Sequence, residues 1–235
     1  ERWTQAGGWQ RLTGIPWQDV VAEPGYVTRW HPLMVVAPDG RLFHGGPTRR
    51  MNWVTANGNG SLTYSGVNVP GVLYPKEGCF AMYDEARILV AGGSINTNTN
   101  PSDGSTGTSG KAAFTIDIRT GTPVVAMTAA MKYARQFCNS VILPNGEVMV
   151  IGGNTSGLKF NDTGSILTPE IWNPVTGQWR DMAPMNVPRN YHSLALLLPD
   201  GRVWSGGGGL AGNSADHRDA QIFTPPQLYT AAGAL

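Results

Sequence analysis

A hairpin that ends in a pair of glycines recurs four times along this 235-residue chain, and the repeat limits the possible folds more than any other feature. Its clearest copy runs from Tyr191 to Gly209, with an apolar run, a Pro-Asp-Gly turn and a short second strand. Proline presets φ for a tight turn, and aspartate and glycine tolerate the geometry that follows. The segment is therefore predicted to be a β-hairpin with Tyr191 and His192 at its open end.

The four copies share one register. His31, Cys138 and His192 each stand 14 residues before the first glycine of their pair, and Cys79 stands 13 residues before its own. The pairs follow one another at intervals of 47, 60 and 54 residues. A period near fifty with Gly-Gly after the second strand is typical of kelch-type propeller blades. We predict an all-β, kelch-type β-propeller with about four blades present, as part of a seven-bladed propeller.

The repeat also sets the expected organisation of the chain. Residues 1–235 are predicted to form one propeller segment, and Trp172 and Trp179 are expected to wedge between blades. Four units do not close a kelch array comfortably, so we expect the segment to belong to a larger polypeptide. The predicted blade units lie near residues 9–66, 67–127, 128–182 and 183–235.

Composition excludes several other classes. Thirty-one glycines, 17 prolines and only 14% charged residues suit many short strands joined by tight turns. A formal net charge of +1 without a long Lys/Arg cluster argues against nucleic-acid binding, and no apolar run is long enough to span a membrane. The two cysteines are too few for a disulfide framework. We further expect Cys79 and Cys138 to lie too far apart to pair, because they belong to different blades and a disulfide requires Cα atoms within about 7 Å.

The residues alone leave the role of the Tyr191–His192 pair open between metal ligation, titration and packing. Because His31 and Cys138 share the register of His192, a metal site made of these three residues is conceivable as well. His217 is expected to be structural, holding the loop before the last strand.

Several motifs together resemble one known family. They are Met51-Asn-Trp53, Cys79-Phe-Ala-Met-Tyr-Asp84, Ala134-Arg-Gln-Phe137, Leu167-Thr-Pro-Glu-Ile171, Tyr191-His192-Ser193, Gly206-Gly-Gly-Gly-Leu210 and Asp219-Ala-Gln-Ile-Phe-Thr-Pro225. The pattern is similar to the galactose oxidase and glyoxal oxidase family of copper radical oxidases, over nearly the whole chain. It corresponds to the middle and late blades of that family's catalytic propeller.

The resemblance implies roles for individual residues. Tyr191 matches the axial tyrosine that accepts the substrate proton, and His192 matches one equatorial copper ligand. Phe160 matches an aromatic side chain of the substrate pocket, and Thr97 stands where galactose oxidase has a pocket tyrosine. Cys138 departs from the family, which commonly has histidine at that position. Imidazole nitrogen and oxygen donors suit Cu(II).

Other parts of the family's site have no counterpart in this chain. The tyrosine that is cross-linked to cysteine is expected in upstream blades, and the second histidine ligand in a C-terminal immunoglobulin-like domain. The resemblance implies oxidation of a primary alcohol or aldehyde, including those of carbohydrates, with O2 as acceptor and hydrogen peroxide as product. It also implies a secreted or periplasmic location. The competing hypothesis is a non-catalytic kelch propeller that binds carbohydrate or protein, since function belongs to the site and not to the fold.

Overall fold

The computed structural model describes residues 1–16, 18, 20, 22–23, 26–27, 31–96, 107–209, 216–230 and 232–233. Thr97 lies outside these residues. The regular secondary structure of the described residues is almost entirely antiparallel strand, with one short 3₁₀ turn at Pro226–Leu228. None of the helices within the described residues is long and apolar enough to cross a membrane.

Four successive sheets form the body of the molecule, and we call them blades 1 to 4. Each is built in chain order, so that every strand pairs with the one before it. Blade 1 contains β5 (Leu33–Val36), β6 (Leu42–Gly46), β7 (Arg50–Thr55) and β8 (Ser61–Asn68). Blade 2 contains β9 (Cys79–Asp84), β10 (Arg87–Ala91), β11 (Ala113–Asp117) and β12 (Val124–Met127).

The two later blades repeat this pattern. Blade 3 contains β13 (Gln136–Ile142), β14 (Val148–Asn154), β15 (Glu170–Trp172) and β16 (Trp179–Asp181). Blade 4 contains β17 (Ser193–Leu197), β18 (Val203–Gly207) and β19 (Ala220–Phe223). The predicted all-β propeller is thereby confirmed, with four blades within the described residues.

Two small hairpins precede the blades. One pairs β1 (Arg2–Thr4) with β2 (Gly8–Gln10), and the other pairs β3 (Ala22–Glu23) with β4 (Tyr26–Val27). Trp9 falls within the predicted first blade unit, whereas its strand β2 pairs with β1 in a separate sheet.

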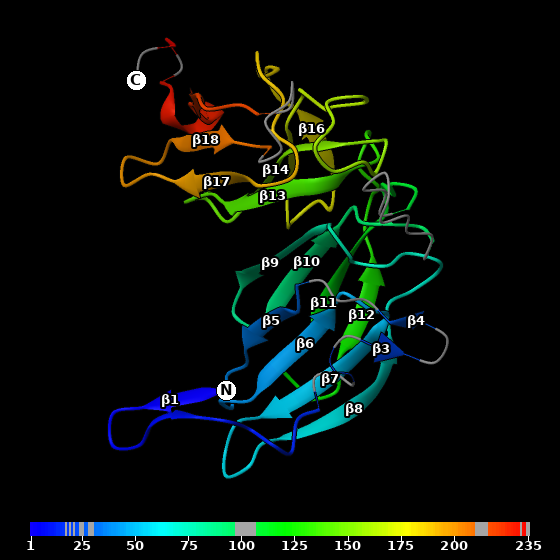
Figure 1. Ribbon diagram of the computed structural model, residues 1–235. Coiled ribbons are helices and arrows are strands. Elements are labelled where there is room, and N and C mark those ends of the chain that lie inside the picture. The colour runs from blue at the N-terminus through cyan, green and yellow to red at the C-terminus, as the bar shows by residue number, and fades with distance from the viewer. Residues whose placement is uncertain are drawn as a thin grey trace.

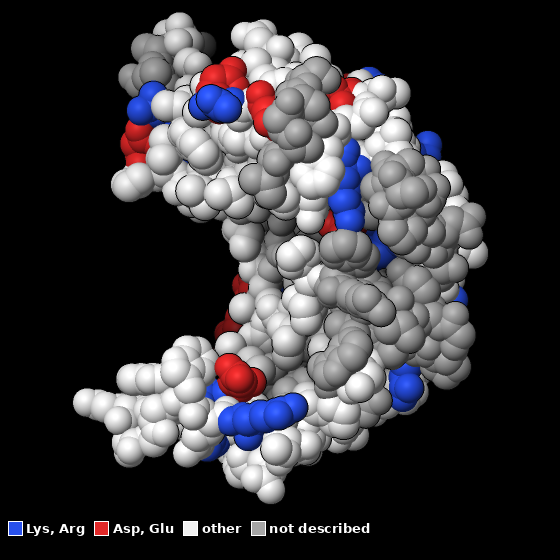
Figure 2. All heavy atoms as spheres, in the orientation of Figure 1, with Lys and Arg blue, Asp and Glu red and all other residues white. Residues whose placement is uncertain are grey.

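The blades follow one another along an arc, with blade 1 lowest and blades 3 and 4 uppermost in Figure 1. The space-filling view in Figure 2 shows the same arc as a crescent with a hollow on one side. The first strand of each blade is an edge strand, and β13 lies against β9 on one side and β17 on the other. Adjacent blades therefore approach one another through their first strands.

The predicted tight turns, Pro-Asp-Gly in two hairpins and Pro-Asn-Gly in a third, are present at the hairpin tips. In blade 1, Gly40 donates to the carbonyl of Ala37 at 2.9 Å with a φ of +82°. Gly146 and Gly201 make the same bond in blades 3 and 4, with φ of +80° and +84°. Glycine is favoured at these positions because a Cβ atom makes the left-handed region costly.

The glycine pairs serve the contact between blades. The second glycine of a pair donates its N–H to an arginine carbonyl of the next blade: Gly93 to Arg135 at 3.0 Å and Gly153 to Arg189 at 2.7 Å. A Cβ atom on Gly152 would lie 2.1 Å from the Arg189 carbonyl oxygen, so the first glycine of that pair has no room for a side chain. The repeated Gly-Gly therefore allows the backbones of two blades to touch.

The same two arginines bind their own blade through buried guanidinium groups. Arg135 donates to the Gly152 carbonyl at 2.9 Å and to the Glu170 carboxylate at 2.5 Å, and both side chains are fully buried. Arg189 repeats the arrangement with the Gly207 carbonyl at 3.1 Å and Asp219 at 3.0 Å. Each arginine thus joins the preceding blade, through its carbonyl, to the second and third strands of its own.

Apolar side chains fill the spaces between the blades. Phe43, Met51, Ile88 and Phe114 belong to the core between blades 1 and 2. Between blades 2 and 3, the Trp172 ring lies edge-on to Tyr83 with centroids 4.9 Å apart. The indole N–H groups of Trp172 and Trp179 donate to the Thr128 hydroxyl and the Ala129 carbonyl, and the predicted wedge between blades is present at both.

The Arg135–Glu170 pair generates a stability prediction. Replacing Arg135 with methionine leaves the Glu170 carboxylate buried without its cation, which should lower the free energy of unfolding by about 3–5 kcal/mol. Urea denaturation of the intact protein measures the change. The control is Arg119→Met, which removes the half-exposed partner of Asp117 and should leave the unfolding midpoint near that of the wild type. Equal losses in the two variants would contradict the role given to the buried pair.

Candidate functional site

Tyr191 and His192 lie immediately before β17, at the open end of the blade 4 hairpin. The glycine run after β18 is hydrogen-bonded to both residues. Gly209 donates its N–H to the Tyr191 carbonyl at 3.0 Å, and its own carbonyl lies 2.7 Å from Nδ1 of His192. A carbonyl accepts only, so Nδ1 carries the proton in this bond, and in the neutral ring Nε2 then presents its lone pair. The predicted position of the pair at the hairpin mouth agrees with the structure.

Two phenylalanines from blade 3 surround Tyr191. Phe137 comes from β13 and Phe160 from the loop after β14. Their ring centroids lie 5.4 Å and 5.2 Å from that of Tyr191, in edge-to-face geometry. Phe160 also approaches the His192 ring at 5.6 Å, and the Tyr191 and His192 rings lie 3.8 Å apart at 30°. The structure therefore brings three of the four predicted site residues together; the fourth, Thr97, falls outside the described residues.

Backbone strain is concentrated around these rings. Among the described residues other than glycine, five have a positive φ, and three of them are Phe137 (+61°), Phe160 (+30°) and His192 (+68°). A fourth is Glu77, at +58°, whose carbonyl accepts the N–H of Phe137 at 2.7 Å. Such conformations cost roughly 1–3 kcal/mol each and persist only where the surrounding structure holds them. Their grouping at one place favours a functional role for this cluster.

Charged side chains that the sequence pattern did not reveal lie around the ring cluster. Burial raises the pKa of Glu77, and the positive charges of His31, Lys159, Lys76 and His192 oppose that shift. Burial also lowers the pKa of Lys76 to about 8 and lowers that of Lys159. The Lys159 ammonium lies 5.3 Å from the centroid of the Tyr191 ring. These groups come from loops of different blades, so only the adjacency of Lys76 and Glu77 was visible in the sequence.

The Tyr191 hydroxyl is therefore set in an environment that favours its neutral form. Burial raises the pKa of the Tyr191 phenol, and the negative charge of Glu77 raises it further. A phenol in this state is a poor proton acceptor, and a nearby cation would lower its pKa again.

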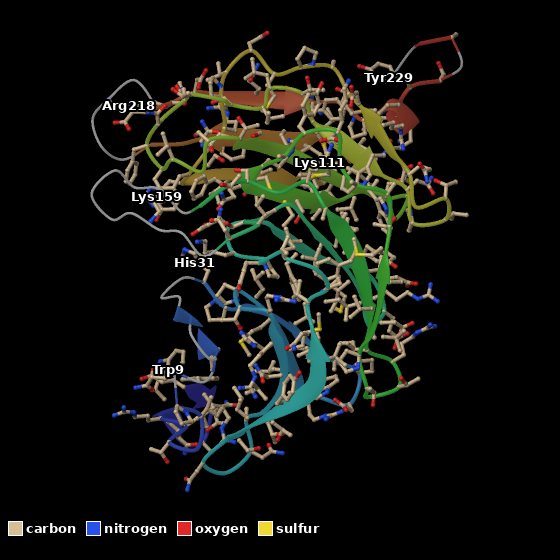
Figure 3. The ribbon with its side chains drawn as sticks, turned by 90° about the vertical axis from the view of Figure 1, so that its right-hand side faces the viewer. Trp9, His31, Lys111, Lys159, Arg218 and Tyr229 are labelled. Carbon is tan, nitrogen blue, oxygen red and sulfur yellow. The ribbon has the colours of Figure 1, made fainter. Side chains whose placement is uncertain are left out.

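The labelled side chains in Figure 3 show on which face of the propeller the site lies. His31, Lys159 and Arg218 follow one edge of the molecule in this view, and Tyr229 lies at the opposite edge. His192 borders a hollow of about 490 Å³ that it shares with Gly208, Gly209, Asp216 and Arg218. The exposed ring of His192 is thus open to molecules that reach this face.

The prediction that Cys79 and Cys138 lie too far apart to pair was wrong. Their sulfur atoms are 2.8 Å apart, although the cysteines belong to different blades. The first strands of blades 2 and 3, β9 and β13, lie side by side, and both cysteines stand near the strand ends where they meet. The expected blade-to-blade separation applies to whole sheets and not to these inner strands.

The roles considered for His31 and His217 are also decided by the geometry. Within the described residues, no three or more His, Cys, Asp or Glu side chains are grouped as a metal site, so His31, Cys138 and His192 do not form one there. His217 places Nε2 2.9 Å from the Asp162 carboxylate, which ties the loop before β19 to blade 3 as a structural residue does.

The donor set of Tyr191 and His192 fits a copper ion. The Gly209 carbonyl fixes the orientation of the His192 ring and its tautomer, and metal-bound histidines commonly have such a partner on the nitrogen that faces away from the metal. Phenol oxygen and imidazole nitrogen beside each other are ligands that Cu(II) accepts in tetragonal geometry. The described residues thus offer two adjacent donors on an accessible face.

Comparisons with known proteins agree with this arrangement. The family model for the glyoxal oxidase N-terminus matches residues 64–220, more than half of the chain. Galactose oxidase of Gibberella zeae is 37% identical over 208 residues, and aldehyde oxidase GLOX of Vitis pseudoreticulata is 29% identical over 190. These alignments cover 83% and 74% of this chain but only 29% and 35% of the relatives.

A solved structure shares both fold and sequence. It is a novel fungal alcohol oxidase with catalytic diversity among the AA5 family, in complex with copper, and it matches with a TM-score of 0.85 at 33% identity. The match covers 98% of this chain and 48% of that one, so the chain spans about half of that enzyme. The model match, the relatives and the shared propeller together show that the chain belongs to the glyoxal oxidase N-terminus family, among the relatives of galactose oxidase.

Proposed function

We propose that the protein containing this chain is a copper radical oxidase that oxidises a primary alcohol or an aldehyde with O2 and releases hydrogen peroxide. The observation that carries the proposal is the His192 ring, which holds its Nδ1 against the Gly209 carbonyl, leaves Nε2 available, and lies 3.8 Å from the Tyr191 ring, centroid to centroid. Family membership supports it, because the relatives include a galactose oxidase, aldehyde oxidases and a copper-bound alcohol oxidase. The family resemblance also implies a secreted or periplasmic location.

In this proposal the chain supplies two of the copper ligands, Tyr191 and His192. A copper ion held there would supply one-electron chemistry, together with the cross-linked tyrosine and cysteine that the family resemblance implies. The Tyr191 oxygen accepts the proton of the substrate hydroxyl, a role that needs the bound cation to overcome the effect of Glu77 on its pKa.

The aromatic neighbours orient the proton acceptor. Phe137 and Phe160 contact Tyr191 edge-on from two directions, so its ring cannot turn without disturbing both. Phe160 also lies edge-on to the His192 ring, with centroids 5.6 Å apart, so one side chain contacts both proposed ligands. Thr97 is proposed as a further pocket residue through the family position that it occupies.

One prediction from the proposed function concerns Tyr191. Tyr191→Phe should lower copper-dependent peroxide release by about 10²–10⁴-fold, since removing a general base has effects of this size. A peroxidase-coupled assay with primary alcohols and aldehydes measures the rate, and chelation of copper should abolish it in the wild type. Tyr229→Phe, at the opposite edge in Figure 3, is the matched control and should retain the wild-type rate.

Absence of peroxide from folded, copper-loaded wild-type protein with every substrate would contradict the oxidase proposal. The family's scaffold would then serve as a binding propeller for carbohydrate or protein. Equal rates in Tyr191→Phe and wild type would leave an oxidase but remove Tyr191 as its base.

The second prediction concerns His192. His192→Ala should weaken Cu(II) binding by more than about 10-fold, because it removes a ligand whose supporting contacts alone are typically worth 10–100-fold. Titration with Cu(II), followed by calorimetry and by nitrogen hyperfine splitting in the electron paramagnetic resonance spectrum, measures the loss. His217→Ala is the control, because His217 is not a proposed ligand and its Nε2 is engaged by the Asp162 carboxylate at 2.9 Å. If both variants bind copper like the wild type, His192 is not a ligand.

A further inference from the structure

The two cysteines of the chain face one another across the boundary between blades 2 and 3. Cys79 begins β9 and Cys138 lies in β13, 59 residues apart in sequence, with their sulfur atoms 2.8 Å apart. A disulfide bond is about 2.05 Å long, so little movement separates this pair from a covalent link. Neither sulfur is required by the proposed oxidase chemistry.

Access to the two sulfur atoms is unequal. Cys138 borders a cavity of about 120 Å³ whose lining includes His31, Glu77 and Phe137. A water molecule occupies about 30 Å³ of liquid volume, so hydrogen peroxide, which has only one oxygen atom more, fits into this space. Cys79 is only 3% exposed and is not among the residues that line the cavity. An oxidant that enters this way therefore meets Cys138 first.

The surroundings also divide the chemical roles. The hydrogen bond from the Cys79 thiol lowers the pKa of the Cys138 thiol, whereas burial raises the pKa of Cys79. The guanidinium of Arg135 acts in the same direction on both sulfurs by favouring the thiolate. Because the thiolate is the nucleophile, Cys138 is the sulfur that attacks and Cys79 the one that resolves.

We propose that Cys79 and Cys138 form a reversible, peroxide-driven disulfide that links blades 2 and 3 beside the Tyr191 ring cluster. The Cys138 thiolate attacks one peroxide oxygen and the O–O bond breaks. The departing hydroxide takes up the proton that the Cys138 thiol had released, so the sulfenic acid and one water are formed. The Cys79 sulfur then displaces the sulfenic oxygen, which leaves as the second water when it takes up the remaining proton. Two thiols and one hydrogen peroxide thus give one disulfide and two waters.

The position of the link connects it to the candidate site. Phe137 precedes Cys138 in β13 and packs against Tyr191, and its N–H is bound by the carbonyl of Glu77, two residues before Cys79. A bond between the sulfurs would therefore add a covalent link beside the Phe137–Glu77 hydrogen bond and close to the ring that packs against Tyr191. The oxidant, hydrogen peroxide, is the product of the proposed reaction. On that proposal, the Cys79–Cys138 disulfide would form while the enzyme turns over.

The test supplies hydrogen peroxide directly and needs neither copper nor turnover, so its failure is distinct from failure of the proposed function. The reduced intact protein is treated with peroxide, free thiols are alkylated under denaturing conditions, and peptides are mapped by mass spectrometry. A Cys79–Cys138 linked peptide that disappears with dithiothreitol is expected. Two alkylated thiols, or a stable sulfenic acid at Cys138 without the link, would overturn the proposal.

Two variants separate the roles of the sulfurs. In Cys79→Ser, peroxide should leave Cys138 as a sulfenic acid that dimedone traps; in Cys138→Ser, Cys79 should stay a thiol at the same peroxide concentration. The thermal unfolding midpoint of wild type should rise on oxidation and fall again on reduction, with no such shift in Cys79→Ser. If a variant does not fold, as judged by circular dichroism, the wild-type peptide map alone decides.

Discussion

The contact between the second glycine of one blade and the arginine carbonyl of the next is the constraint on which the rest of the structure depends. Gly93 and Gly153 each donate one N–H across a blade boundary, at the carbonyls of Arg135 and Arg189. Backbone can approach backbone this closely only because Gly152 and its counterparts carry no Cβ atom. Once that distance is fixed, the first strands of neighbouring blades must lie side by side. The closeness of the cysteines and the packing of Phe137 against Tyr191 are consequences of the same spacing.

The segment that fixes the blade spacing is also the one that carries the candidate site. The carbonyl of Arg189 is held by Gly153 of blade 3, and the side-chain amide of Asn190 donates to the Asp162 carboxylate and the Ser165 hydroxyl. The residue after Asn190 is Tyr191, whose carbonyl accepts the N–H of Gly209. Three consecutive residues are therefore bound before the chain reaches His192. The positive φ of His192 is maintained by these neighbours, because a residue that carries a Cβ atom is uncommon in this conformation.

The sequence predicted what depends on short-range patterns and missed what depends on the approach of separate blades. Turn residues and glycine pairs indicated the hairpins, and the hairpins placed Tyr191 and His192 correctly at an open end. Arg135 and Arg189 also stand in register, each 17 residues before the first glycine of its pair, and this repeat is a sequence signal for their shared role. Glu77 and Lys159 could not be assigned, because their loops meet only in the folded chain. The cysteine distance was misjudged because whole-blade spacing does not hold for the inner strands.

The electrostatics of the ring cluster explain why Tyr191 would need a metal-binding neighbour such as His192 in order to act as a proton acceptor. Burial and the charge of Glu77 both raise the pKa of the Tyr191 phenol, so the polypeptide alone holds it protonated. The Lys159 ammonium lies 5.3 Å from the centroid of the Tyr191 ring, but burial lowers the pKa of Lys159 and so disfavours its own charge. A divalent cation bound by both the Tyr191 oxygen and Nε2 of His192 would act on the phenol directly, because a bound metal ion lowers the pKa of its oxygen ligands. Under the proposed function, the phenol would accept a proton only with the metal bound, so proton transfer and metal binding would depend on the same two side chains.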